Sequence, residues 1–435
     1  MKLRPIVILP ILAATMLPLF AGCSQQGGIS QAPDLFAPAR PGRLDAHARH
    51  MADLPPSAGP FGTACVRTRL VETRRQVLDD QVRAFTAERD NRMTFNLFDD
   101  AQFEGVIEAT ARPSADSVGY SGRILGDGAG GTFTILLYKG RMLANVRVPS
   151  KGTFEIRPVG DAAHLIGEID ESRFPECGVG RQVLPAPQAA PGRRMQPMAD
   201  EAAAADDDGS RFDVLVVYTP AAATTVGGAH QIEALIDLAA FETNIAYQNS
   251  GIASVVQIVH REQTPYTESG SFRDDLLRLA GHGDGFMDDV HALRDGRRAD
   301  FVALIVATGD ACGMAYVMNA VSSSFEDRAF SVVRYDCATG YYSFAHELGH
   351  NMGCCHALND GPCSGAFPDA YGWRFDANGQ TCRTIMAYAP GTRIQHFANP
   401  NVTFNDKPTG SDTANNAAVI GRTAPTAANF RRSGG

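Results

Sequence analysis

Alternating apolar and polar residues dominate the first half of the chain. Between residues 92 and 170 this pattern predicts seven strands, at 92–98, 103–111, 119–125, 132–139, 141–148, 152–158 and 164–170. Glycine and aspartate separate several of them, and strands with period-two alternation bury one face in an antiparallel sheet or sandwich. We therefore expect residues 61–184 to form a mostly β unit.

The pattern changes beyond residue 210. An almost continuous apolar run at 212–218 is typical of a strand buried on both faces, and apolar residues at helical spacing predict a long amphipathic helix at 229–249. Further elements are predicted in the order strand 254–260, helices 272–279 and 286–293, strands 301–307, 313–317 and 330–335, and a helix at about 341–353. Interspersed strands and helices indicate a mixed α/β (α+β) domain over residues 211–435.

The first residues have the pattern of an export signal. Residues 1–22 join a short positive start to an apolar run and end in small residues. Phe20-Ala21-Gly22-Cys23 resembles a bacterial lipobox, with phenylalanine where leucine is usual, so Cys23 is a candidate for lipidation. The alternatives are plain secretion and an uncleaved anchor, although Pro10 and Pro18 interrupt the apolar run.

Two segments lack the periodicity of folded elements. Residues 23–60 are predicted to be a flexible tether, and residues 185–210, with proline, alanine and aspartate runs, an activation linker. The protein is therefore expected to be an outer-membrane-anchored lipoprotein or secreted, with the catalytic domain released on maturation.

Composition bounds the class of function. The 435 residues are 44% hydrophobic and 20% charged, which is ordinary for folded protein and enough for two domains. The net charge of −9 provides no basic face for nucleic acid. Membrane contact is expected only through a lipid anchor.

Three histidines and a glutamate follow one another at spacings that zinc chemistry explains. His346 and His350 are four residues apart, so on a helix both project from one face and can share a Zn²⁺ ion. Glu347 lies beside the first ligand, where it can take a proton from an activated water. Gly353 allows a left-handed exit from the helix that brings back His356 as the third ligand. A fourth position left open marks a catalytic site; the alternative is a buried helix with incidental histidines.

These five positions match H-E-x-x-H-x-x-G-x-x-H, the signature of the metzincin peptidases. In that clan a tight turn places a methionine beneath the histidines, which the resemblance assigns to Met386, against the alternative of a core methionine in a loop. Tyr388 follows two residues later. In astacin-like and serralysin-like members a tyrosine there stabilises the transition state, whereas reprolysin-like relatives lack it, so a packed aromatic is the alternative.

Nine cysteines fit an exported protein. Without Cys23 eight remain, and six of them lie at or beyond residue 312, so we expect three disulfides around the zinc motif. The neighbours Cys354 and Cys355 are expected to have different partners.

Cys177, near the end of the β-rich unit, has two interpretations. The run Pro175-Glu176-Cys177-Gly178-Val179 resembles the cysteine switch of matrix metalloproteinase prodomains, in which a thiolate fills the open zinc position until the prodomain leaves. The alternative is a Cys65–Cys177 disulfide, which parity favours because a free Cys177 leaves Cys65 without a partner.

From Asp213 to about Phe430 the chain resembles a reprolysin-like bacterial zinc metallopeptidase, close to the peptidyl-Asp metalloendopeptidases. Besides the two motifs, the resemblance rests on residues 214–220, 300–304 and 312–316. It implies a twisted five-stranded mixed sheet whose edge strand, 313–317, pairs with an extended substrate peptide. It also implies cleavage on the N-terminal side of Asp or Glu, for which Arg374 and Arg393 are candidate pocket residues.

These observations predict a zinc-dependent endopeptidase made as a zymogen, with Glu347 as general base and protein or peptide as substrate. Ala357 stands where reprolysins carry aspartate, which leaves the subfamily open. One alternative is a zinc-bearing binding or adhesion protein, against which the intact Glu347 argues. Another is a hydrolase of non-peptide substrates, against which the edge strand argues. No sequence pattern addresses a need for calcium.

Overall fold

The computed structural model describes residues 32–128, 130–160, 163–179 and 207–432. The predicted signal segment and Cys23 lie outside these residues. So do residues 180–206, which include most of the predicted linker. From Pro33 onward the described chain forms one unit. Within this part of the chain, no helix is long and apolar enough to cross a bilayer.

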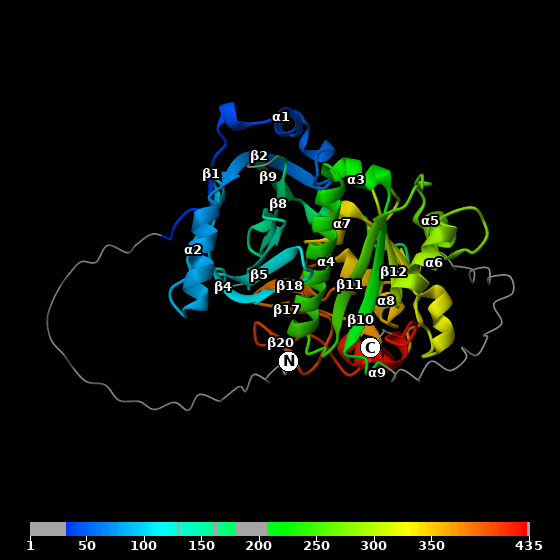
Figure 1. The fold of residues 1–435 in the computed structure, drawn as a ribbon. Coiled ribbons are helices and arrows are strands. Elements are labelled where there is room, and N and C mark those ends of the chain that lie inside the picture. Colours follow the sequence, from blue (N-terminus) through cyan, green and yellow to red (C-terminus); the bar gives the residue numbers. More distant parts are fainter. Residues whose placement is uncertain (1–31, 129, 161–162, 180–206, 433–435) are drawn as a thin grey trace, which may run out of the picture. The chain divides into compact units, whose positions relative to one another are not determined.

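Within the described residues, the alternating segments of the first half form a nine-stranded antiparallel sheet. Its strands are β1 (Phe36–Pro38), β2 (Cys65–Thr73), β3 (Arg92–Phe98), β4 (Ala101–Ala111), β5 (Ser117–Ile124), β6 (Thr132–Tyr138), β7 (Arg141–Val148), β8 (Gly152–Pro158) and β9 (Ala163–Ile169). The order across the sheet is β1-β2-β9-β8-β7-β6-β5-β4-β3 (Figure 1). Strands β3 to β9 correspond to the segments predicted between residues 92 and 170.

Residues 33–60 differ from the flexible tether that their composition predicts. β1 pairs with the edge of β2, and α1 (Ala46–Asp53) buries Ala48 and Met51 against β2 and β9. The Asp45 carboxylate caps α1 by accepting a hydrogen bond of 2.7 Å from the Ala48 N–H. These short elements are stabilised by partners distant in sequence, which composition alone does not reveal. A further helix, α2 (Arg75–Thr86), packs on β3 and β4.

The second half contains, within the described residues, a five-stranded mixed sheet. Its strands are β10 (Arg211–Tyr218), β11 (Val255–Gln263), β12 (Phe301–Val306), β13 (Gly313–Ala315) and β14 (Phe330–Arg334). The order is β11-β10-β12-β14-β13, parallel except for β13, which pairs antiparallel with β14 at the edge. An apolar run fits the central strands because both faces are covered.

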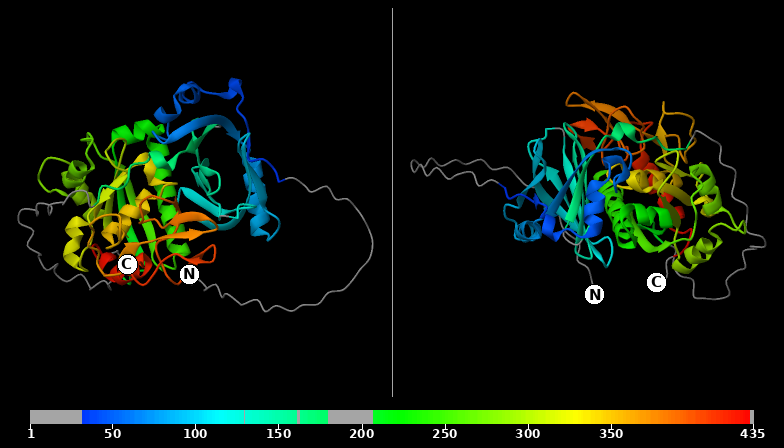
Figure 2. Two further views of the ribbon diagram at one scale, coloured as in Figure 1. Left: turned by 180° about the vertical axis from the view of Figure 1, so that it is seen from behind. Right: turned by 90° about the horizontal axis from the view of Figure 1, so that it is seen from above.

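Helix α4 lies between the two sheets, as three views agree (Figures 1 and 2). Its apolar residues Ala234, Leu238 and Phe241 pack with Leu136 and Leu143 of the N-terminal sheet. The helices of this half are α3 (Pro220–Val226), α4 (Ala229–Asn249), α5 (Phe272–Ala280), α6 (Asp288–Arg297), α7 (Tyr335–Ala338), α8 (Ser343–Asn351) and α9 (Asn416–Ala427).

Polar residues of α4 also contact the N-terminal sheet. The buried Glu242 carboxylate accepts hydrogen bonds from the Thr134 hydroxyl, the Asn145 amide and the Gly340 N–H, at 2.6–2.9 Å. The apolar spacing predicts an amphipathic helix; in the structure its polar residue Glu242 is covered by the first sheet. A buried carboxylate that is fully hydrogen-bonded fixes how the two halves dock.

The C-terminal part consists of short strands and α9. The strands are β15 (Cys355–Ala357), β16 (Tyr371–Gly372), β17 (Arg374–Ala377), β18 (Gln380–Arg383), β19 (Thr392–Arg393), β20 (Thr403–Phe404) and β21 (Lys407–Pro408). Among the described cysteines two disulfides are present, Cys312–Cys337 and Cys355–Cys363. The prediction of three is wrong: Cys354 and Cys382 are free and buried. The Cys354 thiol packs in the main apolar core as a small hydrophobe, a common role of buried cysteine.

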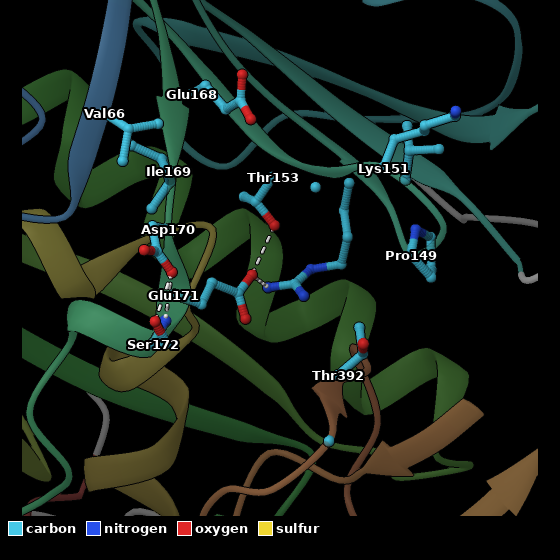
Figure 3. Close-up of a pocket in the computed structure, with 14 residues that line it drawn as sticks. Val66, Pro149, Lys151, Thr153, Glu168, Ile169, Asp170, Glu171, Ser172 and Thr392 are labelled. Atoms are coloured by element: carbon cyan, nitrogen blue, oxygen red, sulfur yellow. Dashed lines mark hydrogen bonds and ion pairs between the residues drawn. The ribbon is translucent and has the colours of Figure 1, made fainter.

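A hollow of about 470 Å³ lies where the ends of β7, β8 and β9 meet Gly391 and the start of β19 (Figure 3). The Glu171 carboxylate there accepts a hydrogen bond from the Thr153 hydroxyl and pairs with the Arg147 guanidinium, each at 2.6 Å. Because Gly391 and Thr392 belong to the second half of the chain and the other lining residues to the first, this hollow lies at the contact between the halves.

Candidate active site

Helix α8 carries the first half of the zinc motif. It places His346, Glu347 and His350 in the protein interior, each at most 1% exposed. The chain then turns at Gly353, whose φ of +88° favours glycine. A Cβ there would lie 2.5 Å from the Ala366 Cβ, so the turn has no room for a side chain. The turn leads directly into β15, which carries His356.

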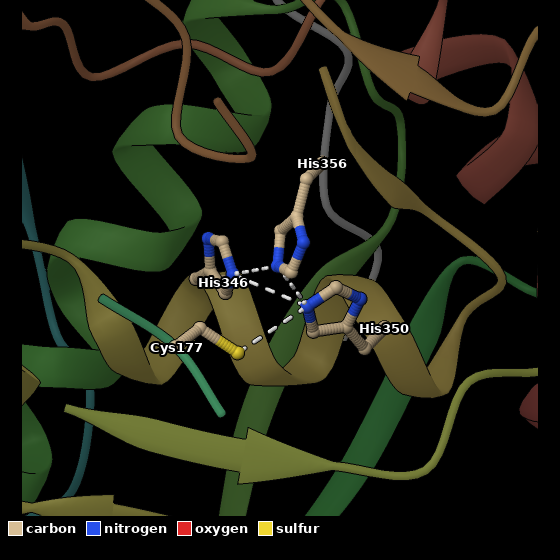
Figure 4. A group of neighbouring side chains, drawn as sticks. All are labelled: Cys177, His346, His350 and His356. Carbon is tan, nitrogen blue, oxygen red and sulfur yellow. Dashed lines mark hydrogen bonds between the residues drawn. The ribbon is translucent and has the colours of Figure 1, made fainter. Parts of the chain in front are cut away.

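The three imidazoles converge through their Nε2 atoms, which lie 2.9–3.2 Å apart (Figure 4). The Nδ1 of His346 donates to the Ile385 carbonyl and that of His350 to the Cys354 carbonyl, both at 2.8 Å. Since a carbonyl only accepts, these Nδ1 atoms carry the protons and both Nε2 atoms present lone pairs. Converging lone pairs are stable around a cation, and ligands about 2.0–2.1 Å from a tetrahedral zinc have separations of this size.

The surroundings keep His346 and His350 neutral. Burial, together with the neighbouring His350 and His356, holds the pKa of His346 well below its usual range. Burial lowers the pKa of His350 to about 4, against the opposing effect of its bond to the Cys354 carbonyl. Neutral imidazole is the form that binds metal, so the site fits a zinc ion near pH 7.

The Cys177 thiol belongs to the same cluster. One ligand atom from each of Cys177, His346, His350 and His356 lies within 4.8 Å of the others, and all four residues are buried. The Cys177 Sγ is 3.6 Å from the His350 Nε2 (Figure 4). It is also 3.5 Å from a Glu347 carboxylate oxygen. Thiolate and imidazole are the ligands that zinc prefers.

The Cys65–Cys177 disulfide that parity favours is wrong, because both cysteines are free. The Cys65 thiol donates instead to the Arg67 carbonyl, at 3.4 Å, within an apolar cluster of the first sheet. An even number of cysteines does not imply that all of them are bonded: among the described cysteines, four have no disulfide partner.

The segment around Cys177 lies along the edge strand. The Gly178 N–H donates to the Gly313 carbonyl of β13 at 2.8 Å. A Cβ on Gly178 would lie 2.3 Å from the Met314 Cε, so a larger residue there would displace the end of the Met314 side chain. Edge strands offer unpaired backbone groups to peptides, and the chain's own segment uses one of them here.

Glu347 lies beside the cluster with one oxygen unused. Its Oε2 contacts the Cys177 thiol, while its buried Oε1 has no hydrogen-bond partner. Burial raises the pKa of Glu347 to about 8, although the Cys177 contact and the Arg393 charge oppose the rise. The space for this side chain comes from Gly313, where a Cβ would lie 2.3 Å from the Glu347 Oε1.

Met386 and Tyr388 flank the cluster on the chain that follows it. Met386 is fully buried against α8, where a Cβ on Gly349 would lie 2.7 Å from its Sδ. The Tyr388 ring lies 4.0 Å from the His356 ring, and its hydroxyl donates to the Cys177 carbonyl at 2.9 Å. Burial raises the pKa of Tyr388, as do the Cys177 and Glu347 charges, so its hydroxyl keeps its proton.

Sequence reasoning missed Asp360. Its carboxylate accepts from the Ala357 N–H at 3.1 Å and the Tyr388 N–H at 2.8 Å, and pairs with Arg374 at 2.6 Å. Arg374 in turn donates to the Tyr388 carbonyl at 2.8 Å. The pair therefore joins the strand of His356 to the loop of Tyr388. The signal available in the sequence is an aspartate in a turn shortly after the third histidine.

We expect Asp360→Asn to reduce kcat/KM about 10–100-fold, the usual cost of removing a group that orients a metal site. The amide oxygen can take the place of Oδ2 and accept both backbone bonds, but the amide nitrogen then faces the Arg374 guanidinium, and two donors cannot pair. Peptide kinetics and thermal unfolding check this result. Asp376→Asn, an exposed aspartate on neighbouring β17, is the matched control and should change neither. Unchanged kinetics in Asp360→Asn would contradict this role.

The fold and this cluster define a metal-dependent peptidase. A model of metallopeptidase family M12 matches residues 208–398. The peptidyl-Asp metalloendopeptidase of Stenotrophomonas maltophilia (strain R551-3) is 35% identical over 313 residues, which are 69% of this chain and 71% of that protein. The chain belongs to the M12 metallopeptidases and is a metalloendopeptidase of the metzincin type, a family that implies zinc.

Two further similarities were found. A peptidyl-Asp metalloendopeptidase of Xanthomonas campestris pv. campestris is 34% identical, covering 64% of this chain and 65% of that protein. A chain of a solved chaperone–substrate complex aligns with a TM-score of 0.41 and 18% identity, covering 52% of this chain and 36% of that one. The second likeness is too weak to carry an argument.

Proposed function

We propose that this chain is an exported zinc endopeptidase made as a zymogen. In this proposal His346, His350 and His356 hold the metal, and Cys177 fills the fourth position until maturation. The convergence of three imidazoles and one thiol within 4.8 Å carries the proposal. Three nitrogen ligands with one exchangeable position are the composition of a catalytic zinc site.

In this proposal the two halves of the chain have different roles. Residues 61–184 are the prodomain, 185–210 the activation linker and 211–435 the enzyme. The docking bonds of Glu242 and the Gly178–Gly313 backbone bond support a prodomain that covers the cleft. The export signal at residues 1–22, with lipidation at Cys23 or simple secretion, stays a proposal from the sequence.

When bound, zinc supplies a Lewis acid that polarises the scissile carbonyl and lowers the pKa of a water toward about 7. Glu347 takes the proton of the attacking water on its unpartnered Oε1 and delivers it to the leaving nitrogen. Tyr388 already donates to a carbonyl in the cleft, that of Cys177, and is suited to donate to the substrate oxyanion.

The substrate is an extended protein or peptide segment that pairs with β13 as the Gly178 segment does. The relatives above are named peptidyl-Asp metalloendopeptidases. We extend that preference to this chain as cleavage before Asp or Glu.

We expect maturation to cleave the chain within residues 181–210, because exposed segments poor in apolar residues are preferred sites of proteolysis. With the acidic preference, self-cleavage before one of the residues Asp206 to Asp208 is the expected route. N-terminal sequencing of the active species tests the zymogen proposal. A start within this range supports it, and an active species that begins near residue 24 contradicts it.

A further inference from the structure

Two buried arginines lie side by side next to the metal-binding cluster. The register of β18 with β19 pairs Arg383 with Arg393, and each is 2% exposed. Among the described residues no carboxylate pairs with either; their hydrogen bonds go to backbone carbonyls and to Tyr341. The Tyr341 ring, 4.1 Å from the Arg393 Cζ, offsets part of the cost of burying these charges. Two buried cations without an anion are otherwise unfavourable and call for an anionic partner.

The two arginines differ in how many of their N–H donors have a hydrogen-bond partner. Arg383 donates to the Gly391 and Ala387 carbonyls, at 2.9 and 2.7 Å, and to the Tyr341 hydroxyl, at 3.1 Å. It therefore fixes the loop on both sides of Tyr388. Arg393 donates to the Tyr341 carbonyl at 2.8 Å, and its buried Nε has no partner. Arg393 thus retains a donor for a ligand.

The position of Arg393 connects it to the reacting groups. Its charge is among the causes, after burial and the neighbouring histidines, that lower the pKa of His346. It also opposes the rise that burial produces in the pKa of Glu347. Arg374, the other arginine considered from the sequence, is already neutralised by its ion pair with Asp360.

The prosegment places an acid on the loop that Arg383 holds at Ala387 and Gly391. Glu176 directly precedes Cys177; its Oε1 accepts from the Ala389 N–H at 3.0 Å, and its buried Oε2 has no partner. Burial and Arg393 lower the pKa of Arg383, and the charge of Glu176 acts in the opposite direction. An acidic side chain next to the metal-site thiol thus lies within electrostatic reach of the arginines.

We propose that Arg393, positioned by Arg383, binds the acidic side chain of the substrate residue that follows the scissile bond, and that Glu176 screens this charge in the zymogen. The inference rests on the proposed function and deepens it. A substrate carboxylate supplies the anion that the buried pair lacks. A neutral side chain of the same size, such as Asn, supplies one accepting oxygen instead of two and no charge, so the buried cations stay uncompensated.

The test uses three peptides that differ only in the residue after the scissile bond: Asp, Asn or Leu. The full chain is matured, with wild-type enzyme in trans where a variant does not process itself. For the wild type we expect kcat/KM for the Asp peptide to exceed that for the Asn peptide at least about 100-fold. Arg393→Gln should lower this ratio at least about tenfold, the effect of about 1.4 kcal/mol, through the Asp peptide alone. Arg393→Lys should lower the ratio less than Arg393→Gln does. Arg297→Gln, a change at an exposed arginine, is the control and should leave the ratio unchanged.

The ratio separates recognition from stability, because a merely structural defect lowers cleavage of all three peptides together. Equal cleavage of the Asp and Asn peptides by the wild type would contradict the proposed acidic pocket. This comparison needs no variant, so it holds even if Arg393→Gln does not fold. An unchanged ratio in a folded Arg393→Gln enzyme would also overturn it. Failure of the zinc-loaded, matured wild type to cleave any of the three would overturn the proposed function, and this inference with it.

Discussion

Glu347→Gln is expected to lower peptide cleavage by the matured enzyme about 10²–10⁴-fold while zinc stays bound, because general-base catalysis contributes a factor of this size. Glutamine fills the same space against Gly313 but cannot accept the proton of the attacking water. The measurement is kcat/KM together with zinc content by elemental analysis. A processed sample is obtained with wild-type enzyme in trans if the variant does not mature alone.

Two comparisons make this result specific. Glu262→Gln changes an exposed glutamate of β11 that contacts His260 and should leave both activity and zinc unchanged. If Glu347→Gln retains full activity with zinc bound, the assignment of the base is contradicted. Loss of zinc along with activity would instead show that Glu347 acts on metal binding.

Cys177→Ser in the full-length chain is expected to raise peptidase activity before maturation at least about tenfold, equivalent to about 1.4 kcal/mol of lost inhibition. A serine hydroxyl at neutral pH is a much poorer zinc ligand than a thiolate, so the fourth position becomes accessible to water and substrate. The gain is expected to stay below that of the matured enzyme. The Gly178 and Tyr388 hydrogen bonds still hold the segment in the cleft.

The matched control is Cys65→Ser, since Cys65 is also free and buried in the N-terminal half but is not part of the metal-binding cluster. It should leave the full-length chain inactive. Activity is measured on the intact chain, with its length verified by mass spectrometry. An intact, zinc-loaded Cys177→Ser chain as inactive as the wild type would contradict the switch.

The proximity of the site residues could be predicted because it is encoded in short spacings. A separation of four residues on a helix fixes the relation of His346 to His350, and the structure brings His356 back through the Gly353 turn. Apolar periodicity likewise predicted the buried strands and α4, since burial on one or both faces leaves a local pattern in the sequence.

Features that depend on residues distant in sequence could not be predicted in this way. Asp360 gains its importance only because the chain returns to bring the Tyr388 N–H within 2.8 Å. Arg374 and Arg393 are indistinguishable in the sequence. The Asp360 ion pair of Arg374 and the burial of Arg393 separate them in the structure. The fold of residues 33–60 and the free state of Cys65 depend in the same way on packing partners elsewhere in the chain.

The central claim is that the zymogen holds zinc through three histidines and its own thiol. X-ray absorption at the zinc edge, on the purified zinc-loaded full-length chain, tests it most directly. We expect three nitrogen ligands at about 2.0–2.1 Å and one sulfur at about 2.3 Å, with the sulfur lost after maturation and in Cys177→Ser. A full-length spectrum with nitrogen and oxygen ligands but no sulfur would contradict the account.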